Sequence, residues 1–456
     1  MRDTLTARLR ILNDRVAVID RGTSRSYAEL ADEIDRLGTA FDAAGMDAGA
    51  TVVLHGDFSF SQIAAFYALY LRRNIVIPVV SFTEISYDAV RNTCRAEFVV
   101  EVGDEVTVER YDPVDGAESE RIGVLRAGGQ SGLILLSSGS TGKPKAILHD
   151  LDALFAEKVK SSGHFSRTPR NILLFLLADH IGGINSLLGV LSSRASAVIP
   201  AERTPGEICS LVERYGIRLL PTSPTFLNLV LIGGFHRQHD LSSLKLITYG
   251  TEPMQEELLR RVHAAIPGAR LLQTFGTSET GISTTSSKSS SSTSFRIEDD
   301  GSEYRVVDGE LQLRTRTQFL GYLNYSNEAV TEDGWFRTGD LVEETGDGYL
   351  KVKGRAAEVI NVGGEKVLPL ELESILLGSP EISDCVVFGM PNAITGQAVH
   401  VEVVPARDLS KAELRHHVRT FLDGKVEPFK MPAKVSIVAR TAVSARFKKD
   451  RKINRG

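Results

Sequence analysis

The stretch from Ser137 to Lys145, with the sequence SSGSTGKPK, gathers the chemical groups that can hold a polyphosphate. Gly139 and Gly142 carry no Cβ, so neighbouring backbone N–H groups can point at a ligand. Side chains add hydrogen-bond donors and positive charge, which phosphate oxygens require; these come from Ser137, Ser138, Ser140, Thr141, Lys143 and Lys145. The loop is not a Walker A motif, because that motif has a glycine where Ser137 stands. The alternative is a flexible Ser/Gly turn.

Other apolar runs also end in short polar loops. The run 171–177 leads to His180, Gly182 and Gly183, the run 246–249 leads to 250–252, and the run 271–275 leads to 276–280. Ligands of parallel sheets bind beyond the carboxyl ends of the strands. We therefore expect His180 to face a pocket, with the two glycines leaving space. The alternative for a lone histidine is an ordinary core or surface position.

The order of these runs indicates the fold class. Repeated strand–helix–strand patterns up to about residue 250 predict an α/β fold, with parallel sheets flanked by helices. Short strands between Gly and Asp turns over 304–348 predict a small β-rich subdomain. After Gly354 an α+β pattern of about a hundred residues has the size of a small domain. We expect an N-terminal domain over 1–354 and a C-terminal domain over 355–456. The Ser/Thr-rich stretch 283–294 predicts a solvated loop, with a lid as the alternative.

Composition excludes several classes of function. The net charge of −5 gives no reason to expect nucleic acid or an anionic membrane as the main partner. The three cysteines lie far apart and indicate neither a disulfide framework nor a zinc site. No apolar run approaches the ~20 residues that span a bilayer, and the N-terminus lacks a signal-peptide core. We expect a soluble cytoplasmic enzyme without membrane insertion.

These pieces, in this order, resemble the acyl-adenylate-forming superfamily of acyl- and aryl-CoA synthetases, peptide-synthetase adenylation domains and luciferases. The resemblance spans nearly the whole chain. It rests on the loop 137–145, on Phe275–Glu279 for the aromatic-Gly-x-Thr-Glu motif, on Thr338-Gly339-Asp340 for the ribose motif, and on Gly354-Arg355 followed by 363–367 and 369–373. It implies ATP-dependent activation of a carboxylic acid to an acyl-adenylate with release of pyrophosphate. Transfer to a thiol, most often that of CoA, would follow with release of AMP.

The resemblance assigns roles around ATP. The phosphate loop would hold the β- and γ-phosphates, and Phe275 would stack on adenine. Asp340 would accept hydrogen bonds from the ribose hydroxyls, and Arg355 would add a donor near the ribose or phosphate. Glu279 would ligate Mg²⁺ together with Thr141. The remaining residues expected at ATP are Gly250, Thr251, Glu252, Gly276, Thr277 and Ser278.

The resemblance also implies a catalytic lysine on a mobile C-terminal domain. Lys448 falls at the family position, with Phe447 in place of the family glycine and Lys449 as a second candidate. After adenylation this domain would rotate, carry Lys448 away, and bring Gly363 and Gly364 beside the pantetheine channel. The family hinge usually has Asp or Lys where this chain has Ala357.

The acyl pocket indicates which member of the family this is. It is expected to include His180, as a catalytic pocket residue, together with Ile181, Gly182, Gly183, Gly250 and Gly276. Peptide-synthetase domains place an Asp at the position of Ile181 to pair with the substrate ammonium. An unpaired buried ammonium is costly, so an α-amino acid is disfavoured.

A CoA ligase for a fatty, aryl or otherwise modified acid is therefore the leading hypothesis. The alternatives are a ligase that loads a holo acyl-carrier protein, transfer to an amine, and an adenylate-fold protein without catalysis. The implied ligands are ATP, Mg²⁺, a small carboxylic acid, and CoA or the phosphopantetheine of a carrier protein. We expect a monomer or a homodimer.

Overall fold

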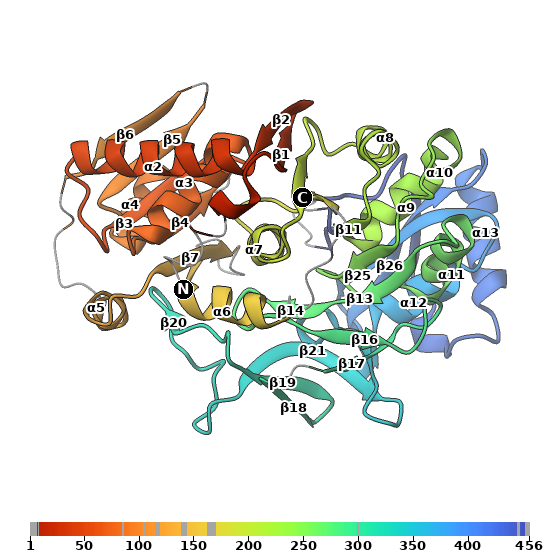
Figure 1. The fold of residues 1–456 in the computed structure, drawn as a ribbon. Helices are drawn as coiled ribbons and strands as arrows, with labels where there is room; N and C mark the ends of the chain where they lie inside the picture. The colour runs from red at the N-terminus through yellow and green to blue at the C-terminus, as the bar shows by residue number, and fades with distance from the viewer. Residues whose placement is uncertain are drawn as a thin grey trace. The chain divides into compact units, whose positions relative to one another are not determined.

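The structure is a computed structural model that describes residue 7 and residues 9–83, 86–103, 105–112, 114, 119–137, 144–161, 170–298, 301–444 and 447–451 (Figure 1). The chain divides into two compact units, each made of several segments. Unit 1 comprises Met1–Pro221, Gly276–Ser283 and Arg314–Phe336, and unit 2 comprises Thr222–Phe275, Thr284–Leu313 and Arg337–Gly456.

Unit 1 contains a seven-stranded sheet with the order β20-β8-β7-β4-β3-β5-β6. The strands are β3 (Thr51–His55), β4 (Ile75–Val79), β5 (Phe98–Val102), β6 (Val106–Arg110), β7 (Gly132–Ser137), β8 (Lys145–Asp150) and β20 (Gly321–Tyr322). The central strands β7, β4, β3 and β5 are parallel, as the sequence predicts, and β6, β8 and β20 pair antiparallel with their neighbours. The fold is therefore α/β, with antiparallel strands added at both edges of a parallel centre.

Helices of unit 1 follow from local sequence signals. Helix α2 (Tyr27–Ala43) begins with a capping box, in which Ser26 Oγ accepts from Glu29 N and the Glu29 carboxylate accepts from Ser26 N. It buries the apolar stripe that includes Leu30, Ile34, Leu37 and Phe41. Helix α3 (Phe60–Leu71) is apolar on nearly all sides and almost wholly buried. The other helices of this part are α4 (Tyr87–Cys94) and α5 (Glu120–Ala127).

Five further strands pair in the order β11-β9-β10-β1-β2. They are β1 (Val16–Asp20), β2 (Thr23–Ser26), β9 (Asn171–Leu173), β10 (Ser196–Ile199) and β11 (Leu219–Thr222), and α6 (Leu151–Ser161), α7 (Ile181–Ser192) and α8 (Pro205–Tyr215) lie between them in the chain. The apolar run 171–177 forms a strand only over its first three residues. Leu174 N still bonds Val198 O, so the run leaves the ladder just after that residue.

Unit 2 begins with helix α9 (Pro224–Ile232), helix α10 (Phe235–Gln238), helix α11 (Glu256–Ala265) and two parallel strands, β12 (Leu246–Tyr249) and β13 (Arg270–Gln273). The β-rich subdomain is a six-stranded sheet with the order β16-β17-β22-β21-β19-β18. Its strands are β16 (Thr285–Ser287), β17 (Ser294–Ile297), β18 (Ser302–Val307), β19 (Glu310–Thr315), β21 (Phe336–Glu344) and β22 (Leu350–Arg355).

The Ser/Thr-rich stretch 283–294 is not the solvated loop that its composition predicts. Strands β16 and β17 pair antiparallel, with Thr285 opposite Ile297. Ser287 Oγ accepts from Gln273 N at 2.9 Å, and Ser290 Oγ accepts from Leu271 N at 3.1 Å. The hydroxyls thus take the place of strand carbonyls along β13, which is why a polar low-complexity sequence is ordered here.

The last part of unit 2 is an α+β arrangement of the predicted size. Its sheet has the order β24-β23-β26-β25, and β27 adds to β26. Its elements are β23 (Ile360–Val362), β24 (Glu365–Val367), α12 (Pro369–Leu376), β25 (Ile382–Asn392), β26 (Gly396–Pro405), α13 (Lys411–Leu422) and β27 (Lys434–Ile437). Its core packs the α13 residues Leu414, Val418 and Leu422 with Val387 and Val401 of the sheet.

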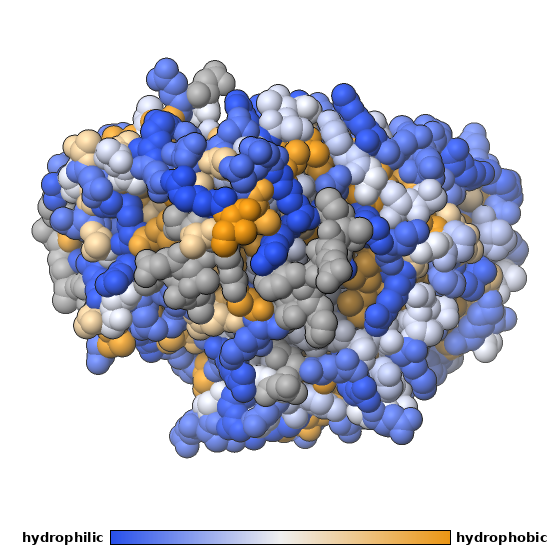
Figure 2. Space-filling view, in the orientation of Figure 1, coloured by the Kyte–Doolittle hydropathy of each residue, from blue (hydrophilic) through white to orange (hydrophobic). Residues whose placement is uncertain are grey.

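The surface, the cysteines and the helix lengths complete the description of the fold. On the face drawn in Figure 2, hydrophilic residues dominate and hydrophobic ones show in small patches. Cys94, Cys209 and Cys385 are all buried and carry free thiols. Across the described residues, no helix is both long enough and apolar enough to cross a bilayer.

Candidate active site

The predicted phosphate loop is described only at its two ends. Ser138, Gly139, Ser140, Thr141, Gly142 and Lys143 lie outside the described residues. Ser137 ends β7 and Lys145 begins β8, and these two residues are directly paired in an antiparallel ladder. The strand–helix–strand pattern predicted from the sequence is wrong at this point, because a second strand, β8, stands between the loop and α6.

Glu279 is held by an aromatic residue that sequence reasoning missed. The Tyr322 hydroxyl donates to Glu279 Oε1 at 2.9 Å. Lys145 Nζ lies 4.9 Å from the centroid of the same ring. Burial and the Glu279 carboxylate raise the pKa of Tyr322, so the phenol stays a neutral donor. Tyr322 thus links a predicted phosphate-loop lysine to the predicted metal-ligating carboxylate in unit 1.

Glu279 fits the expected use of Mg²⁺. Among the described residues, no group of three or more His, Cys, Asp or Glu side chains could hold a metal ion by itself. Magnesium is usually bound through one or two carboxylates together with substrate phosphates, and it does not need such a cage. Tyr322 bonds Oε1 of Glu279, and Oε2 would be the oxygen that ligates a cation.

The buried His149 on β8 was also missed. The residue is 1% exposed, and its Nε2 lies 2.6 Å from Ser278 O. A carbonyl oxygen can only accept, so Nε2 carries the proton. Burial lowers the pKa of His149 to about 4, which keeps the ring neutral. The sequence signal available was a histidine directly after the apolar residues 146–148, in the first strand after the phosphate loop.

The turn that carries Glu279 is fixed along its backbone. Thr280 O accepts from the hydroxyls of Thr315 and Thr317, both at 2.8 Å. A Cβ on Gly276 would stand 2.1 Å from Gly281 O, so only glycine fits between β14 (Phe275–Thr277) and β15 (Gly281–Ser283). Together with the Ser278 contact, these bonds fix the position from which Glu279 projects.

His180 caps helix α7. Its Nδ1 accepts from Gly182 N at 3.1 Å, which leaves the proton on Nε2. A Cβ on Gly183 would fall 1.9 Å from Leu177 O, and one on Gly182 would fall 2.6 Å from Leu176 Cδ1. The glycines therefore let the helix start pack closely on the preceding run, in addition to any space they leave for a ligand. The neighbouring Ile181 is buried and apolar.

The loop 250–252 follows β12 in unit 2. A Cβ on Gly250 would stand 2.6 Å from Thr274 Oγ1, and Thr251 has a left-handed φ of 71°. The Glu252 carboxylate accepts from Thr225 N at 2.7 Å and from Lys449 N at 3.1 Å. In this predicted adenine loop, the Glu252 carboxylate therefore bonds to backbone N–H groups of the protein. Burial raises the pKa of Glu252.

Three predicted residues come together in unit 2. Asp340 on β21 lies opposite Arg355 on β22, and its Oδ1 accepts from Arg355 Nε at 3.1 Å. Burial raises the pKa of Asp340, whereas the charges of Arg355 and Lys448 lower it. The pattern is a buried acceptor beside two cations. Elsewhere, Phe275 stacks on Phe295 with ring centroids 5.4 Å apart, and Gly363 and Gly364 form the exposed β23–β24 turn with positive φ.

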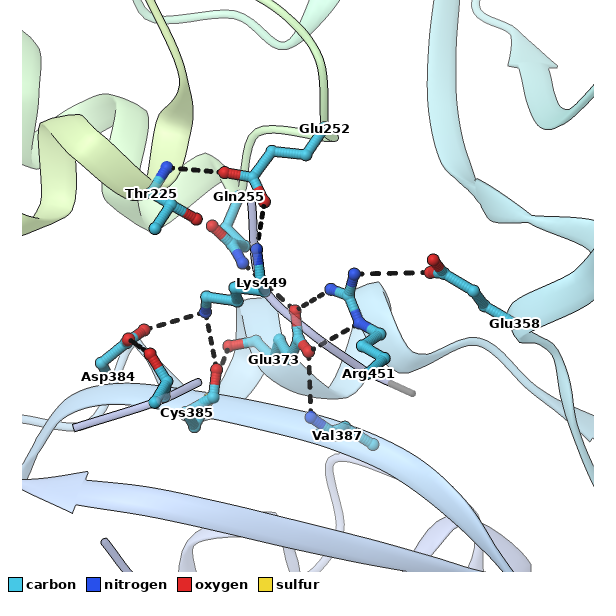
Figure 3. A network of polar contacts seen from close by, with 11 residues as sticks. Thr225, Glu252, Gln255, Glu358, Glu373, Asp384, Cys385, Val387, Lys449 and Arg451 are labelled. Carbon is cyan, nitrogen blue, oxygen red and sulfur yellow. Dashed lines mark hydrogen bonds and ion pairs between the residues drawn. The ribbon is translucent and has the colours of Figure 1, made fainter. Parts of the chain in front are cut away.

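Within unit 2, the segment 447–451 contacts residues near α9 and the loop 250–252, and it also contacts the C-terminal α+β part (Figure 3). Phe447 replaces the family glycine but keeps a left-handed φ of 51°. Its carbonyl accepts from Ser223 Oγ at 2.8 Å, and its ring meets the edge of Phe226 at 5.3 Å. Lys449 Nζ contacts Asp384 and Cys385 O. The side chain of Lys449, the second candidate for the catalytic lysine, is therefore bound within the protein.

These features define an adenylate-forming enzyme, with α/β sheets, a β-rich subdomain and an α+β C-terminal part. Residues 6–323 match the family described as AMP-binding enzyme, and residues 371–448 match the AMP-binding enzyme C-terminal domain. The chain belongs to the AMP-binding enzyme family. It is an AMP-forming acid–thiol ligase that activates a carboxylic acid with ATP.

The chain is similar to several named enzymes. It is 30% identical to the indoleacetate–CoA ligase of Aromatoleum aromaticum, over 90% of this chain and 88% of that one. It is 28% identical to the 2,3-dihydroxybenzoate-AMP ligase of Bacillus subtilis, over 96% and 89%. An anthranilate CoA ligase in complex with anthranoyl-AMP shares the fold with a TM-score of 0.81 at 20% identity, over 98% of this chain and 95% of that one. An amide bond synthetase from Marinactinospora thermotolerans does so with a TM-score of 0.80 at 21% identity, over 99% and 98%.

Proposed function

We propose that this enzyme couples ATP to an aryl or other modified carboxylic acid and then transfers the acyl group to CoA. A carboxylate oxygen attacks the α-phosphorus of ATP, the bond to the β-phosphate oxygen breaks, and pyrophosphate leaves. The CoA thiolate then attacks the acyl carbonyl, and AMP leaves with the electron pair of the broken acyl–oxygen bond. The named relative that acts as a CoA ligase, at 30% identity over most of both chains, supports CoA as the acceptor.

The observation that carries the proposal is the placement of Asp340, Arg355 and Lys448. A buried carboxylate offers an acceptor for the ribose hydroxyls; burial raises the pKa of Asp340, and the charges of Arg355 and Lys448 oppose that rise. Carboxylate and ATP are both anions, so nearby positive charge must offset their repulsion as the new bond forms. Lys448 would supply that charge at the reacting groups, and Arg355 would supply it near the ribose.

Unit 1 supplies the groups proposed for the phosphates. Glu279, held by Tyr322, would ligate Mg²⁺, which when bound neutralises charge on the phosphate oxygens. Lys145 would contact the phosphates from the start of β8, and the loop residues Ser137 to Lys143 are proposed to bind the same phosphates. His149 fixes Ser278 and thereby the backbone from which Glu279 projects.

The buried Ile181 supports an acid without an α-ammonium. A carboxylate would be needed to pair such an ammonium, and an isoleucine side chain offers none. His180 stands beside it as the cap of α7, where its Nδ1 accepts from Gly182 N. The names of two relatives mention the aromatic acids indoleacetate and 2,3-dihydroxybenzoate, which supports aryl acids as the first substrates to test.

Pyrophosphate exchange into ATP that depends on added acid tests the first half-reaction. A panel of aryl, fatty and dicarboxylic acids should include at least one that supports exchange, and no exchange with any acid would overturn the proposal. Asp340→Asn keeps the shape of the side chain but weakens its acceptor, so it serves as the matched variant with reduced exchange.

An assay of the second half-reaction identifies which acceptor receives the acyl group. The active acid is incubated with CoA, with a holo acyl-carrier protein, or with an amine, and the product is identified by mass. A thioester with CoA is expected. Exclusive loading of the carrier protein, or amide formation alone, would replace CoA by that acceptor. The division at residue 354, rotation of 355–456 and a monomeric or homodimeric state remain predictions of the same proposal.

A further inference from the structure

We propose that Lys449 and Arg451 are positioning residues that hold Lys448 beside Asp340 for the adenylation step. This inference rests on the proposed function. The two residues follow Lys448 on one short segment, and each places a long cationic side chain against a buried carboxylate (Figure 3).

Lys449 makes a fully buried ion pair. Its side chain is 4% exposed, and Nζ donates to Asp384 Oδ1 at 2.8 Å and to Cys385 O at 2.6 Å. The other oxygen of Asp384 accepts from Thr441 Oγ1 at 2.6 Å. Burial alone lowers the pKa of Lys449, but Asp384 and Glu373 raise it above its ordinary value. Lys449 is thus a charged anchor with little freedom to reach a substrate.

Arg451 makes the second anchor. Its Nη2 donates to Glu373 Oε2 at 2.7 Å and its Nε to Oε1 at 3.3 Å, which is a bidentate pair. The Glu373 side chain is 0% exposed and also accepts from Val387 N at 2.9 Å and from Gln255 Nε2 at 3.2 Å. Arg451 Nη1 lies 3.4 Å from Glu358. The buried carboxylate is therefore satisfied on several sides and fixes the guanidinium.

The two anchors define the direction of Lys448, the residue that directly precedes them. Lys449 forms a β-bridge with Val443, and side chains of an extended segment alternate between its two sides. Lys449 and Arg451 both turn toward the carboxylates of the α+β part, so Lys448 turns away from them. Burial raises the pKa of Asp340, and the charge of Lys448 offsets part of that rise.

The anchors also set the register of the segment. Lys448 and Lys449 are adjacent, and a slip by one residue would put Lys448 in the place of Lys449. That slip would also place Asp450 where Arg451 meets Glu373, and two carboxylates would face each other in a buried site. Only the observed register pairs both anions with cations. Apolar residues would hold the segment equally well but would not select its register.

The test separates positioning from mere stability by removing both charges of one anchor. Lys449→Met alone leaves Asp384 buried and unpaired, so a lower Tm is expected. Lys449→Met with Asp384→Asn removes both charges, and the amide oxygen introduced by the second substitution can still accept from Thr441, so Tm should recover. Lys411→Met, at an exposed lysine that begins α13, is the matched control.

Each variant is measured in both half-reactions with the acid found active in the wild type. In the double variant we expect kcat for acid-dependent pyrophosphate exchange to stay at least about tenfold below wild type, with KM for ATP within about twofold. Thioester formation from preformed acyl-AMP should stay within about twofold of wild type, because Lys448 is not needed there.

Two outcomes would overturn the inference. Exchange that recovers together with Tm in the double variant would make the ion pair purely structural. Equal losses in exchange and in thioester formation would place the defect outside the adenylation step. Absence of exchange in the wild type itself would overturn the proposed function, and the positioning role with it, so the two failures are distinguishable.

Discussion

The buried His149 should make the stability of unit 1 depend on pH. In the fold, burial lowers the pKa of this imidazole to about 4, whereas an unfolded chain has a histidine pKa of about 6.5. As the pH falls below about 6.5, the unfolded state binds a proton that the folded state does not bind. The contribution of the neutral ring is therefore complete above that pH and is lost as the pH falls toward about 4.

The size of this effect follows from the two pKa values. They differ by about 2.5 units, and each unit corresponds to about 1.36 kcal/mol, so the full change is about 3 kcal/mol. Between pH 7 and pH 4.5 most of it, about 2.5 kcal/mol, should be lost. Carboxylates also titrate in this range. The comparison therefore uses His149→Gln, whose amide can still donate to Ser278 but does not titrate.

Urea unfolding followed by tryptophan fluorescence measures the effect. The single tryptophan, Trp335, belongs to unit 1, as His149 does. The free energy of unfolding of the wild type relative to His149→Gln should fall by about 2–3 kcal/mol between pH 7 and pH 4.5. His416→Gln, at an exposed histidine of α13, should show no such change. A difference between wild type and His149→Gln that is constant over this range would refute the reasoning.

Three further variants test the proposed site. Lys448→Ala should lower acid-dependent exchange by about a hundredfold or more but leave thioester formation from preformed acyl-AMP nearly intact; equal losses would contradict its role. Asp340→Ala removes the ribose acceptor, so calorimetry should show ATP binding weaker by about tenfold, and unchanged affinity would count against the assignment. Tyr322→Phe removes the donor to Glu279, and exchange should then need a higher Mg²⁺ concentration. An unaltered Mg²⁺ dependence would separate Tyr322 from the metal site.

Sequence patterns were sufficient where the deciding interactions are local. The repeated strand–helix–strand pattern up to about residue 250 predicted the α/β part, to which β4 and α2 belong. The α+β pattern after residue 354 predicted the sheet and helices of the C-terminal part. In each case the period of apolar residues determines which face is buried, and neighbouring residues in the chain supply the caps.

Patterns were insufficient where a partner is distant in the chain. The serines of 283–294 read as solvated, but Ser287 and Ser290 bond to backbone groups of β13 that no local pattern reveals. Likewise the apolar run 171–177 has the composition of a strand throughout, but its ladder ends near Leu174. Tyr322 follows Glu279 by 43 residues, so its contact with that carboxylate depends on the tertiary fold.

The two lysines at 448 and 449 show the same limit at the candidate site. Their types are identical and their positions differ by one, so composition and spacing cannot decide which one faces the substrate. The deciding carboxylate, Asp384, precedes Lys449 by 65 residues and becomes its partner only in the folded chain. Phe447 is a similar case, because a left-handed φ disfavours a bulky residue unless other contacts compensate. Its edge-on contact with Phe226 is such a contact, so this departure from the family glycine is compatible with the same backbone path.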